Sequence, residues 1–393
     1  MTERLFDRDA YIREFDAVVT DSGSADKKTF VKLSATAFYP EGGGQPGDSG
    51  VLVFEGEDKA PRRVKVLDTQ EKDGEIIHIT DTAIPAGTPV RGQLDWEPRF
   101  DRMQNHSGEH IVSGLVHAAY GYNNVGFHMG SERITIDFDG MLTREQLDEI
   151  EEKANAVVWQ NEETQIRVCT QEEAALLTYR SKKELTGLVR IVTFPGADTC
   201  ACCGTHVKRA GEIGLIRLIS VEKFRSGVRV ELLCGRMALA YLRTMEEQNH
   251  RVSVLLSAKP DQTGEAVKRL QEQEMAESYR LIEMENESFR QIADEHRGEG
   301  DVLIIRDGLG PDQVRRLCVE VMETCGGRCA VFSGSDGTDY KYVIGHQGGD
   351  IRAFVKEMNE ALSGRGGGKP FFVQGRVQSS RENIEKFFAE KEK

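Results

Sequence analysis

The sequence contains no run of about 18 apolar residues, the length that a membrane-spanning helix needs. It also lacks an apolar segment near its start, because MTERLFDRDAYIREFD is charged throughout, which argues against a secretory signal. We therefore expect a cytoplasmic protein without a membrane partner. At 393 residues, with 39% hydrophobic and 30% charged residues, the chain has the length of two or three globular domains.

The chain has no surplus of basic residues, since its formal net charge is −14 at pH 7. Phosphate contacts depend on Lys and Arg, so this balance argues against nonspecific binding of nucleic acid over the whole surface. It does not exclude a local basic patch. Net charge bears on solubility and leaves the fold open.

The eight cysteines are unevenly spread, and three of them fall within DTCACCGTHV at 198–207. In a reducing cytosol such a cluster is more typical of metal binding or catalysis than of disulfides. Cys202 and Cys203 are adjacent, which suits a disulfide poorly. We therefore expect a metal site, and a redox sensor built on Cys200, Cys202 and Cys203 is an alternative.

The first part of the chain, residues 1–98, has short β-branched runs separated by turn residues, which predicts a small barrel or sandwich of strands. Within it, YPEGGGQPGDSG at 39–50 is rich in glycine. This segment is either a long turn or a backbone that approaches a ligand or another domain closely, as glycine permits.

Residues 99–238 combine helical and strand patterns. Apolar residues recur close to the helical period from Phe100 to Leu115, and Gly121 is a suitable helix end. A second helix is expected at 143–159, where it begins with a capping-box pattern. Strand-like runs precede and follow this helix, so the segment reads as an α+β domain.

Residues 239–299 are polar and rich in Glu, and their apolar spacing is irregular, which predicts a long helical arm rather than a strict coiled coil. Residues 300–393 alternate strand and helix patterns, as in a compact α/β domain. A second Gly-rich segment, RGGGKPFFVQGR, lies at 365–376.

Two motifs in the α+β segment supply metal-ligand types. HSGEH places His106 and His110 four residues apart, on one face of a helix. The cysteine cluster adds Cys202 and His206 in CxxxH spacing, and together the four residues form a plausible tetrahedral zinc set. Glu109 adjoins the second histidine, unlike the Glu of the HExxH protease motif, so peptide hydrolysis fits poorly.

Five motifs resemble, in their order along the chain, the editing module of alanyl-tRNA synthetase: YPEGGGQPGD, MQNHSGEH, TIDF, TCACCGTHVKRAGEIGLIRL and GVRVELLCG. They are most similar to its free-standing relatives, the AlaX-type alanyl-tRNA editing proteins, over residues 1–238. The terminal GGGKP segment is similar to the DHHA1 domain of alanyl-tRNA synthetase. The chain has no room for an aminoacylation core and contains no Asp-His-His triplet, which favours editing over aminoacylation or phosphoester hydrolysis.

The resemblance implies hydrolysis of tRNA(Ala) mischarged with serine, and glycine is a second candidate. It also implies zinc ligands at His106, His110, Cys202 and His206. Cys203 stands where the family usually has glycine, and it is the alternative thiolate. Zinc would activate water, polarise the ester carbonyl or, in a closed four-ligand site, orient the terminal adenosine of the tRNA.

Three further residues are expected in the catalytic pocket. Thr36 maps to the family's threonine, whose hydrogen bond accepts serine and leaves alanine without a partner. His128 is expected to position water or substrate, and Gln45 is a weaker candidate. Glu109 is either a general base or, as we favour, an exposed helical residue.

RNA contacts are expected from basic residues near the cysteine cluster and in the terminal segment: Lys208, Arg209, Lys223, Arg225, Arg229, Arg365, Lys369 and Arg376. Arg225 and Arg229 are expected at alternating strand positions, and so on one face of a sheet. The arm and the terminal domain would hold the tRNA elbow or form a homodimer.

We therefore expect an α+β protein with an N-terminal small β-barrel (1–98), a zinc-binding editing domain (99–238), a helical arm (239–299) and an α/β DHHA1-like domain (300–393). The expected function is trans-editing of mischarged tRNA(Ala) by an aminoacyl-tRNA deacylase. The alternative is a noncatalytic tRNA- or protein-binding module whose zinc is structural.

Overall fold

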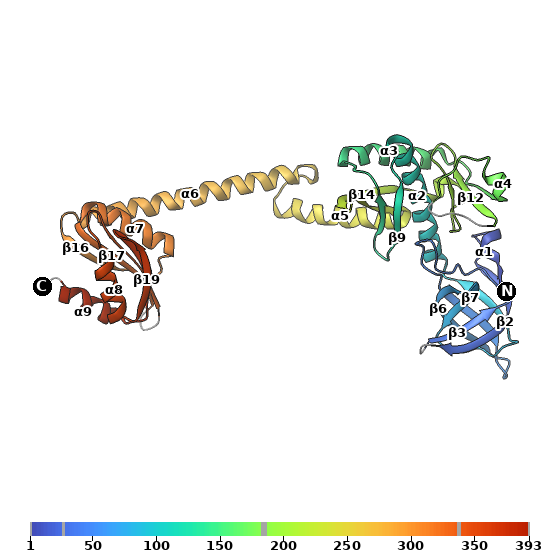
Figure 1. Ribbon diagram of the computed structural model, residues 1–393, viewed down its shortest axis with the longest axis horizontal. Coiled ribbons are helices and arrows are strands. Elements are labelled where there is room, and N and C mark those ends of the chain that lie inside the picture. Colours follow the sequence, from blue (N-terminus) through green and yellow to red (C-terminus); the bar gives the residue numbers. More distant parts are fainter. Residues whose placement is uncertain (1, 26–27, 182–186, 336–338, 392–393) are drawn as a thin grey trace. The chain divides into compact units, whose positions relative to one another are not determined.

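In the computed structural model, which describes residues 2–25, 28–181, 187–335 and 339–391, the β-rich start of the chain forms a closed barrel (Figure 1). Inward-facing side chains such as Val31, Leu33 and Leu52 are fully buried and fill it. The barrel order is β2 (Glu14–Ala25), β3 (Lys28–Leu33), β7 (Glu75–Thr80), β6 (Pro61–Lys72), β5 (Gly50–Glu55) and β8 (Pro89–Leu94).

The chain start and the segment before the Gly-rich loop lie together beside the barrel. Strand β1 (Glu3–Arg4) pairs in parallel with β4 (Ala35–Thr36), and the short helix α1 (Leu5–Arg8) follows β1. Phe6 of α1 packs edge-on against Tyr39, with ring centroids 5.4 Å apart. The aromatic pair fixes the start of the Gly-rich loop.

The α+β segment is built on the long helix α2 (Trp96–Tyr120). As expected, α2 ends at Gly121, whose φ of 73° suits a left-handed cap. The predicted capping box is also present at the start of the next long helix, α3 (Arg144–Gln160). Two short elements, α4 (Gln171–Ala174) and the 3-10 helix η1 (Ala210–Ile213), also lie in this segment.

Two antiparallel sheets surround α2 and carry the loops of the site. The larger sheet has the order β14 (Ile216–Phe224), β15 (Gly227–Cys234), β10 (Ile134–Phe138) and β9 (Asn124–Met129). The smaller has the order β11 (Gln165–Cys169), β12 (Val189–Phe194) and β13 (Asp198–Ala201).

A buried ion pair joins the Gly-rich loop to α2. Asp48 and Arg99 expose 1% and 0% of their side chains, and Arg99 Nε lies 2.8 Å from Asp48 Oδ2. Arg102 adds a 3.0 Å contact to the second carboxylate oxygen, and the Tyr39 backbone N–H donates to Asp48 at 2.6 Å. Arg99 also donates to two backbone carbonyls, so its charge is fully compensated.

The helical arm expected at 239–299 consists of two helices. Helix α5 (Gly235–Leu255) begins directly after β15, and α6 (Thr263–Glu295) follows the 3-10 turn η2 (Pro260–Gln262). Ser257 has a φ of 49°, and Pro260 has no N–H to continue a helical ladder. These two residues separate α5 from α6.

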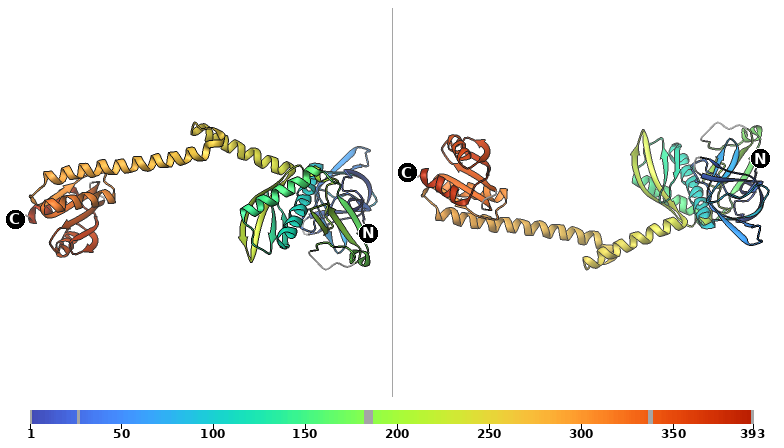
Figure 2. Two further views of the ribbon diagram at one scale, coloured as in Figure 1. Left: turned by 90° about the horizontal axis from the view of Figure 1, so that it is seen from above. Right: turned by 90° about the horizontal axis from the view of Figure 1, so that it is seen from below.

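Residues 251–393 form one compact unit and residues 1–250 another. Helix α6 contacts α7 (Pro311–Thr324) at its end, where Phe289 and Ala293 enter the core, and its earlier part is largely exposed (Figure 2). The sheet of this unit has the order β16 (Gly300–Ile305), β17 (Gly326–Ser335), β18 (Asp339–His346), β20 (Phe372–Val377) and β19 (Gly364–Lys369), with α8 (Arg352–Ala361) and α9 (Arg381–Lys391) beside it.

The alternation of strand and helix expected at 300–393 is thus present, in a mixed sheet whose β16 and β17 are parallel. The whole fold is of the α+β class. Within the described ranges, none of the helices combines the length and the apolar character that crossing a membrane requires.

His78 is a buried polar group inside the barrel. Its Nδ1 lies 3.2 Å from the Val31 carbonyl, and its Nε2 lies 2.8 Å from Thr36 Oγ1. Burial lowers the pKa of His78 to about 4, so the ring is neutral near pH 7. Because Nδ1–H donates to Val31, Nε2 accepts the hydroxyl proton of Thr36.

We predict that His78 makes the first unit less stable in acid. Its folded pKa of about 4 lies below the ordinary value of 6.5, so this stabilisation is complete above about pH 6.5 and is lost as the pH falls towards 4. Relative to His78→Gln, the wild-type free energy of unfolding should fall by about 3 kcal/mol between pH 7 and pH 3.5. Urea unfolding followed by tryptophan fluorescence measures this.

Both tryptophans, Trp96 and Trp159, lie in the first unit, so their fluorescence follows that unit alone. Substitution of the exposed His250 by Gln is the matched control and should leave the pH dependence unchanged. Parallel pH curves for wild type and His78→Gln would contradict the prediction.

Candidate metal centre and pocket

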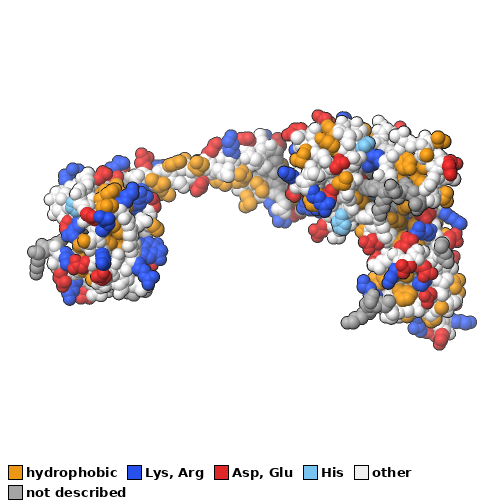
Figure 3. Space-filling view, in the orientation of Figure 1, with side chains coloured by type: hydrophobic (Ala, Val, Ile, Leu, Met, Phe, Trp, Pro, Cys, Tyr) orange, Lys and Arg blue, Asp and Glu red, His pale blue; other side chains and the backbone are white. Residues whose placement is uncertain are grey.

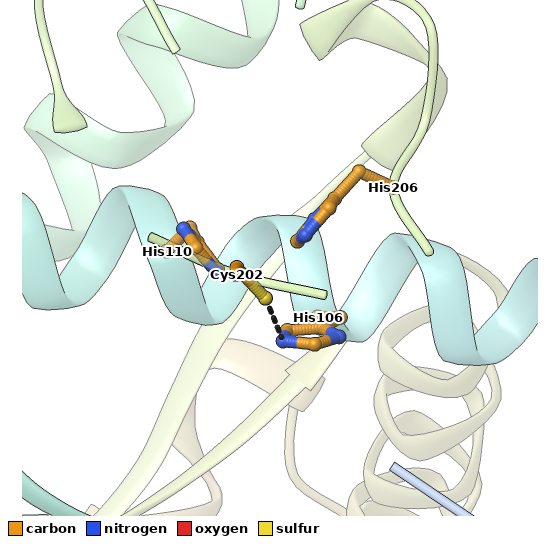
Figure 4. A group of neighbouring side chains, drawn as sticks. All are labelled: His106, His110, Cys202 and His206. Atoms are coloured by element: carbon orange, nitrogen blue, oxygen red, sulfur yellow. Dashed lines mark hydrogen bonds between the residues drawn. The ribbon is translucent and has the colours of Figure 1, made fainter. Parts of the chain in front are cut away.

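Four side chains from two distant segments meet beside α2. His106 and His110 extend from α2, and Cys202 and His206 reach them from the loop after β13 (Figure 4). One ligand atom of each residue lies within 4.8 Å of those of the other three, and Cys202 Sγ is 3.5 Å from His106 Nε2. The structure therefore brings together the four residues that the sequence grouped, with Cys202 rather than Cys203 among the histidines.

Glycines allow this close approach of loop and helix. A Cβ on Gly204 would lie 2.2 Å from His106 Cε1, so a larger residue at 204 would displace the imidazole. On the helix, a Cβ on Gly108 would lie 2.2 Å from Cys234 Sγ of β15. Close packing against neighbouring side chains therefore explains why the HSGEH and CCGTH motifs contain glycine at these two positions.

Each histidine directs its Nε2 towards the centre of the cluster. His106 Nδ1 lies 3.0 Å from Gln45 Oε1, and His110 Nδ1 lies 3.0 Å from Asp198 Oδ2. His206 Nδ1 has a longer contact of 3.5 Å with Ser107 Oγ. Since acceptors hold the Nδ1 protons of His106 and His110, their Nε2 lone pairs are available to a metal.

The charges of the cluster also suit a cation. Although burial opposes ionisation, the neighbouring His106 and His110 lower the pKa of Cys202 well below that of an ordinary thiol. Burial lowers the pKa of His206 to about 3, which keeps this ring neutral. Against burial, the Cys202 thiolate raises the pKa of His110, so a metal that binds here replaces the proton on its Nε2.

An unpaired buried nitrogen gives an independent reason for a metal. His206 is 2% exposed, and its Nε2 has no hydrogen-bond partner in the described parts of the chain. Burying such a group without a partner is costly. A thiolate and three imidazoles at this spacing fit a tetrahedral divalent metal and would satisfy the nitrogen.

The cluster opens into a pocket of about 540 Å³, a volume within the range of small-ligand sites. Its lining includes Phe6, Tyr39 and Pro40, and it carries both basic and acidic side chains, among them Arg190 and the ion pair of Arg4 with Glu71. His106 and His110 of the cluster also line it. The pocket therefore joins the barrel side of the unit to the metal-ligand residues.

Glu109 was expected to be an exposed helical residue, and that expectation is wrong. Glu109 is 1% exposed and lines the pocket. This face of α2 is covered by Asn124 of β9 and by the loop after β13, residues 202–206, which we call the cysteine loop. Ser113 Oγ donates to Glu109 Oε1 at 2.7 Å, and Asn124 Nδ2 donates to the same oxygen. The carboxylate is thus held in a buried network beside His110.

The Gly-rich loop approaches another part of the molecule, as one of its two interpretations predicted. Gly44 has a φ of 88°, and a Cβ there would lie 2.6 Å from the Phe127 carbonyl of β9. Gln45 is fully buried in this loop and also donates to Thr205 Oγ1 at 2.9 Å. The structure thus places Gln45 on the outer side of His106 rather than on the pocket wall.

The other two expected pocket residues lie elsewhere. Thr36 is fully buried beside the barrel, where its hydroxyl contacts His78 and accepts from the Phe38 N–H at 3.1 Å. His128 is exposed on β9, opposite Thr135 of β10. Neither is among the residues that line the pocket.

The basic residues near the cysteine loop are mostly engaged within the protein. Arg229 forms a two-point ion pair with Asp137, at 2.6 and 2.8 Å, and Lys208 Nζ lies 3.1 Å from Asp9. Arg209 donates to the Asn161 carbonyl at 2.5 Å, and Lys223 is exposed at the end of β14.

Arg225 was expected to share a strand face with Arg229, and it does not. It lies in the turn between β14 and β15 with a φ of 53°, because Phe224 pairs with Gly227 to close the hairpin.

The terminal unit contains a row of cations that the sequence analysis found only in part. Arg365 of β19 lies opposite Arg376 of β20, which lies opposite Lys341 of β18. These three residues line a groove of about 1150 Å³, and Arg376 lies 3.4 Å from Asp339. Like charges in register are unfavourable unless an anion compensates them. Figure 3 shows basic side chains gathered on this unit.

Two residues at the cluster were missed by the sequence analysis. Asp198 and Arg180 form a nearly buried ion pair, with Arg180 Nε 2.7 Å from Asp198 Oδ1. The period of two that places Asp198, Cys200 and Cys202 on one side of an extended segment is a signal that could have found Asp198. Arg180 had no such signal.

Comparison with known proteins shows which families this chain is similar to. Residues 189–230 match the family described as threonyl and alanyl tRNA synthetase second additional domain, and residues 11–98 match class II (A) tRNA synthetases. The alanine–tRNA ligase of Ignicoccus hospitalis is 34% identical over 69% of this chain, although the match covers only 30% of that enzyme.

Two similar proteins match over most of their own length. The alanyl-tRNA editing protein AlaX-L of Pyrococcus horikoshii is 28% identical, over 98% of this chain and 96% of that protein. The alanyl-tRNA editing protein Aarsd1-A of Xenopus laevis is 28% identical, over 90% and 86%. The chain is thus a relative of the AlaX-type alanyl-tRNA editing proteins, which confirms the resemblance found in the sequence.

Among solved structures, the C-Ala domain of Aquifex aeolicus alanyl-tRNA synthetase is 18% identical, with a TM-score of 0.21. The match covers 24% of this chain and 88% of that domain, a similarity too low to support a structural argument.

We predict that replacing Cys202 by Ala abolishes metal binding, whereas replacing Cys203 by Ala leaves it intact. Cys202 Sγ faces His106, and Cys203 is exposed outside the four-residue group. Metal content per chain, measured by plasma emission spectrometry after dialysis against zinc, checks this. Loss of zinc from Cys203→Ala alone would assign the thiolate to Cys203.

Proposed function

We propose that this protein is a zinc-dependent aminoacyl-tRNA deacylase that hydrolyses the ester of mischarged tRNA(Ala) in the cytoplasm. Serine is its chief substrate amino acid and glycine a second. The observation that carries this proposal is the cluster of His106, His110, Cys202 and His206, three of which, His106, His110 and Cys202, line the adjoining pocket. The names of the whole-length relatives support the same reaction.

His106, His110, Cys202 and His206 would hold the zinc ion. Zinc supplies Lewis-acid chemistry, which stabilises negative charge that develops on an oxygen as an ester is attacked. The residues of the chain bind and orient the substrate: Tyr39 and Phe6 are nearly buried and line the pocket, and Arg190, which also lines it, would favour a phosphate of the tRNA.

Thr36 is proposed to distinguish serine from alanine. Its proton is donated to His78, and one lone pair accepts from the Phe38 N–H, so it can act on a substrate only as an acceptor. A serine hydroxyl can donate to that acceptor, and alanine cannot. The position of Thr36 just before the Gly-rich motif supports this role, and its side chain is fully buried. His128 is kept as a candidate for positioning water from the exposed face of β9.

The domain roles follow the same proposal. Residues 1–98 and 99–238 form the editing module, residues 239–299 are the arm, and residues 300–393 are a DHHA1-like domain that binds tRNA or forms a homodimer. Hydrophobic side chains alternate with charged ones along the exposed α6, which suits contact with a partner (Figure 3). The proposed RNA contacts are Lys208, Arg209, Lys223, Arg225, Arg229, Arg365, Lys369 and Arg376, with Lys341 now added.

We predict selective hydrolysis of Ser-tRNA(Ala) over Ala-tRNA(Ala) by the zinc-loaded protein. His106→Ala should lower kcat/KM for the serine ester at least ~100-fold, because it removes a metal ligand. His117→Ala, on an exposed face of the same helix, is the control and should be unaffected. Release of labelled amino acid from each charged tRNA measures these rates.

Thr36→Val in the same assay should reduce the preference for serine over alanine about 10- to 100-fold, the usual range for removal of one hydrogen bond to a substrate. No hydrolysis of any ester by zinc-loaded wild type would instead favour the noncatalytic binding module. Four protein ligands would leave zinc no open position for water or substrate, as in structural zinc sites, and this supports the second candidate.

We predict that the cation row contributes to tRNA affinity by pairing with phosphates. Replacement of Lys341, Arg365 and Arg376 by Gln should weaken binding and reduce the slope of log affinity against log salt by about 0.9 for each phosphate that is no longer neutralised. Fluorescence anisotropy with labelled tRNA(Ala) at several salt concentrations measures both. Lys386→Gln, at an exposed position on α9, is the control, and an unchanged slope in the triple variant would count against the proposal.

A further inference from the structure

Asp198 occupies an unusual position for a carboxylate in this protein. Its side chain is 1% exposed, and Oδ2 lies 3.0 Å from His110 Nδ1. Arg180 contacts both oxygens, with Nε 2.7 Å from Oδ1 and an Nη 2.9 Å from Oδ2. A buried carboxylate needs such compensation, because its desolvation is costly.

The backbone is built to hold this pair in place. The Arg180 N–H donates to the Thr199 carbonyl at 2.8 Å, and the Ala201 N–H donates to the Arg180 carbonyl at 2.9 Å. On the other side, Gly114 of α2 faces Asp198, and a Cβ on Gly114 would lie 2.5 Å from Asp198 Cβ. Only glycine lets β13 approach α2 one turn after His110.

We propose that Asp198, held by Arg180, is the positioning residue that fixes the tautomer and orientation of His110 for the metal. This inference depends on the metal site of the proposed function. Asp198 accepts the Nδ1 proton, which leaves the Nε2 lone pair facing His106, Cys202 and His206. Carboxylates that hold a ligand histidine in this way raise its affinity for the metal.

Asp198 is a positioning residue and not itself a ligand. His110, Asp198 and Cys200 also lie close enough together to form a second metal group. However, the guanidinium of Arg180 contacts both carboxylate oxygens, and a cation placed there would be repelled. The same His110 nitrogen cannot donate to Asp198 and coordinate a metal.

The experiment measures zinc affinity in the full chain, by competition with a chromophoric chelator at pH 7.5. Asp198→Ala should weaken zinc binding about 10- to 100-fold, the usual effect of removing the partner of a ligand histidine. Asp198→Asn retains an oxygen that accepts the Nδ1 proton, so it should recover part of the loss. Asp137→Ala is the matched control, because Asp137 has the same two-point pairing with Arg229 and no contact with the cluster.

A second readout separates orientation from general stability. In zinc-loaded protein labelled with ¹⁵N-histidine, His110 should give a hydrogen-bonded Nδ1–H resonance that Asp198→Ala loses and Asp137→Ala keeps. Tryptophan fluorescence identifies variants that do not fold. If Asp198→Ala does not fold, Asp198→Asn is compared with wild type instead.

The two proposals fail in different ways. A wild-type chain that binds no zinc overturns the metal site and this inference with it. A wild-type chain that binds zinc, with Asp198→Ala binding equally well, overturns the role of Asp198 alone.

Discussion

The carboxylate of Asp48 is the contact on which the arrangement of the site depends. It is 1% exposed, it pairs with Arg99 and Arg102 of α2, and it accepts from the backbone at Tyr39. This one side chain therefore ties the Gly-rich loop of the barrel to the helix that carries His106 and His110. Removal of the Asp48 carboxylate would leave the buried Arg99 guanidinium without its counter-charge, which is strongly destabilising.

Because Asp48 fixes the loop, Gln45 reaches the metal-ligand residues from the barrel side. Its amide accepts from His106 and donates to Thr205, so one residue bridges the helix and the cysteine loop. Asp198 acts on His110 from the opposite side of the cluster. The orientation of the two helical histidines is thus determined by neighbours that lie far from them in the sequence.

Local pattern explains which parts of this arrangement the sequence could predict. The i, i+4 spacing of His106 and His110, the capping box of α3 and the glycine that ends α2 are short-range features, and each is present. Glu109 was predicted to be exposed and is buried, because β9 and the cysteine loop, which are distant in the sequence, cover that face of α2. Arg180 and Lys341 could not be found either, since the role of Arg180 arises from its side-chain contacts with Asp198 and that of Lys341 from pairing between strands.

The proposed acceptor at Thr36 also limits what the pocket can select. A group that only accepts can favour serine, whose hydroxyl donates, by about the value of one hydrogen bond. It cannot separate glycine from alanine, since neither side chain has a donor. Any preference for glycine over alanine would have to come from steric exclusion of one methyl group, which is worth only about 1–3 kcal/mol. In its proposed role, Thr36 would therefore separate serine from alanine but not glycine from alanine.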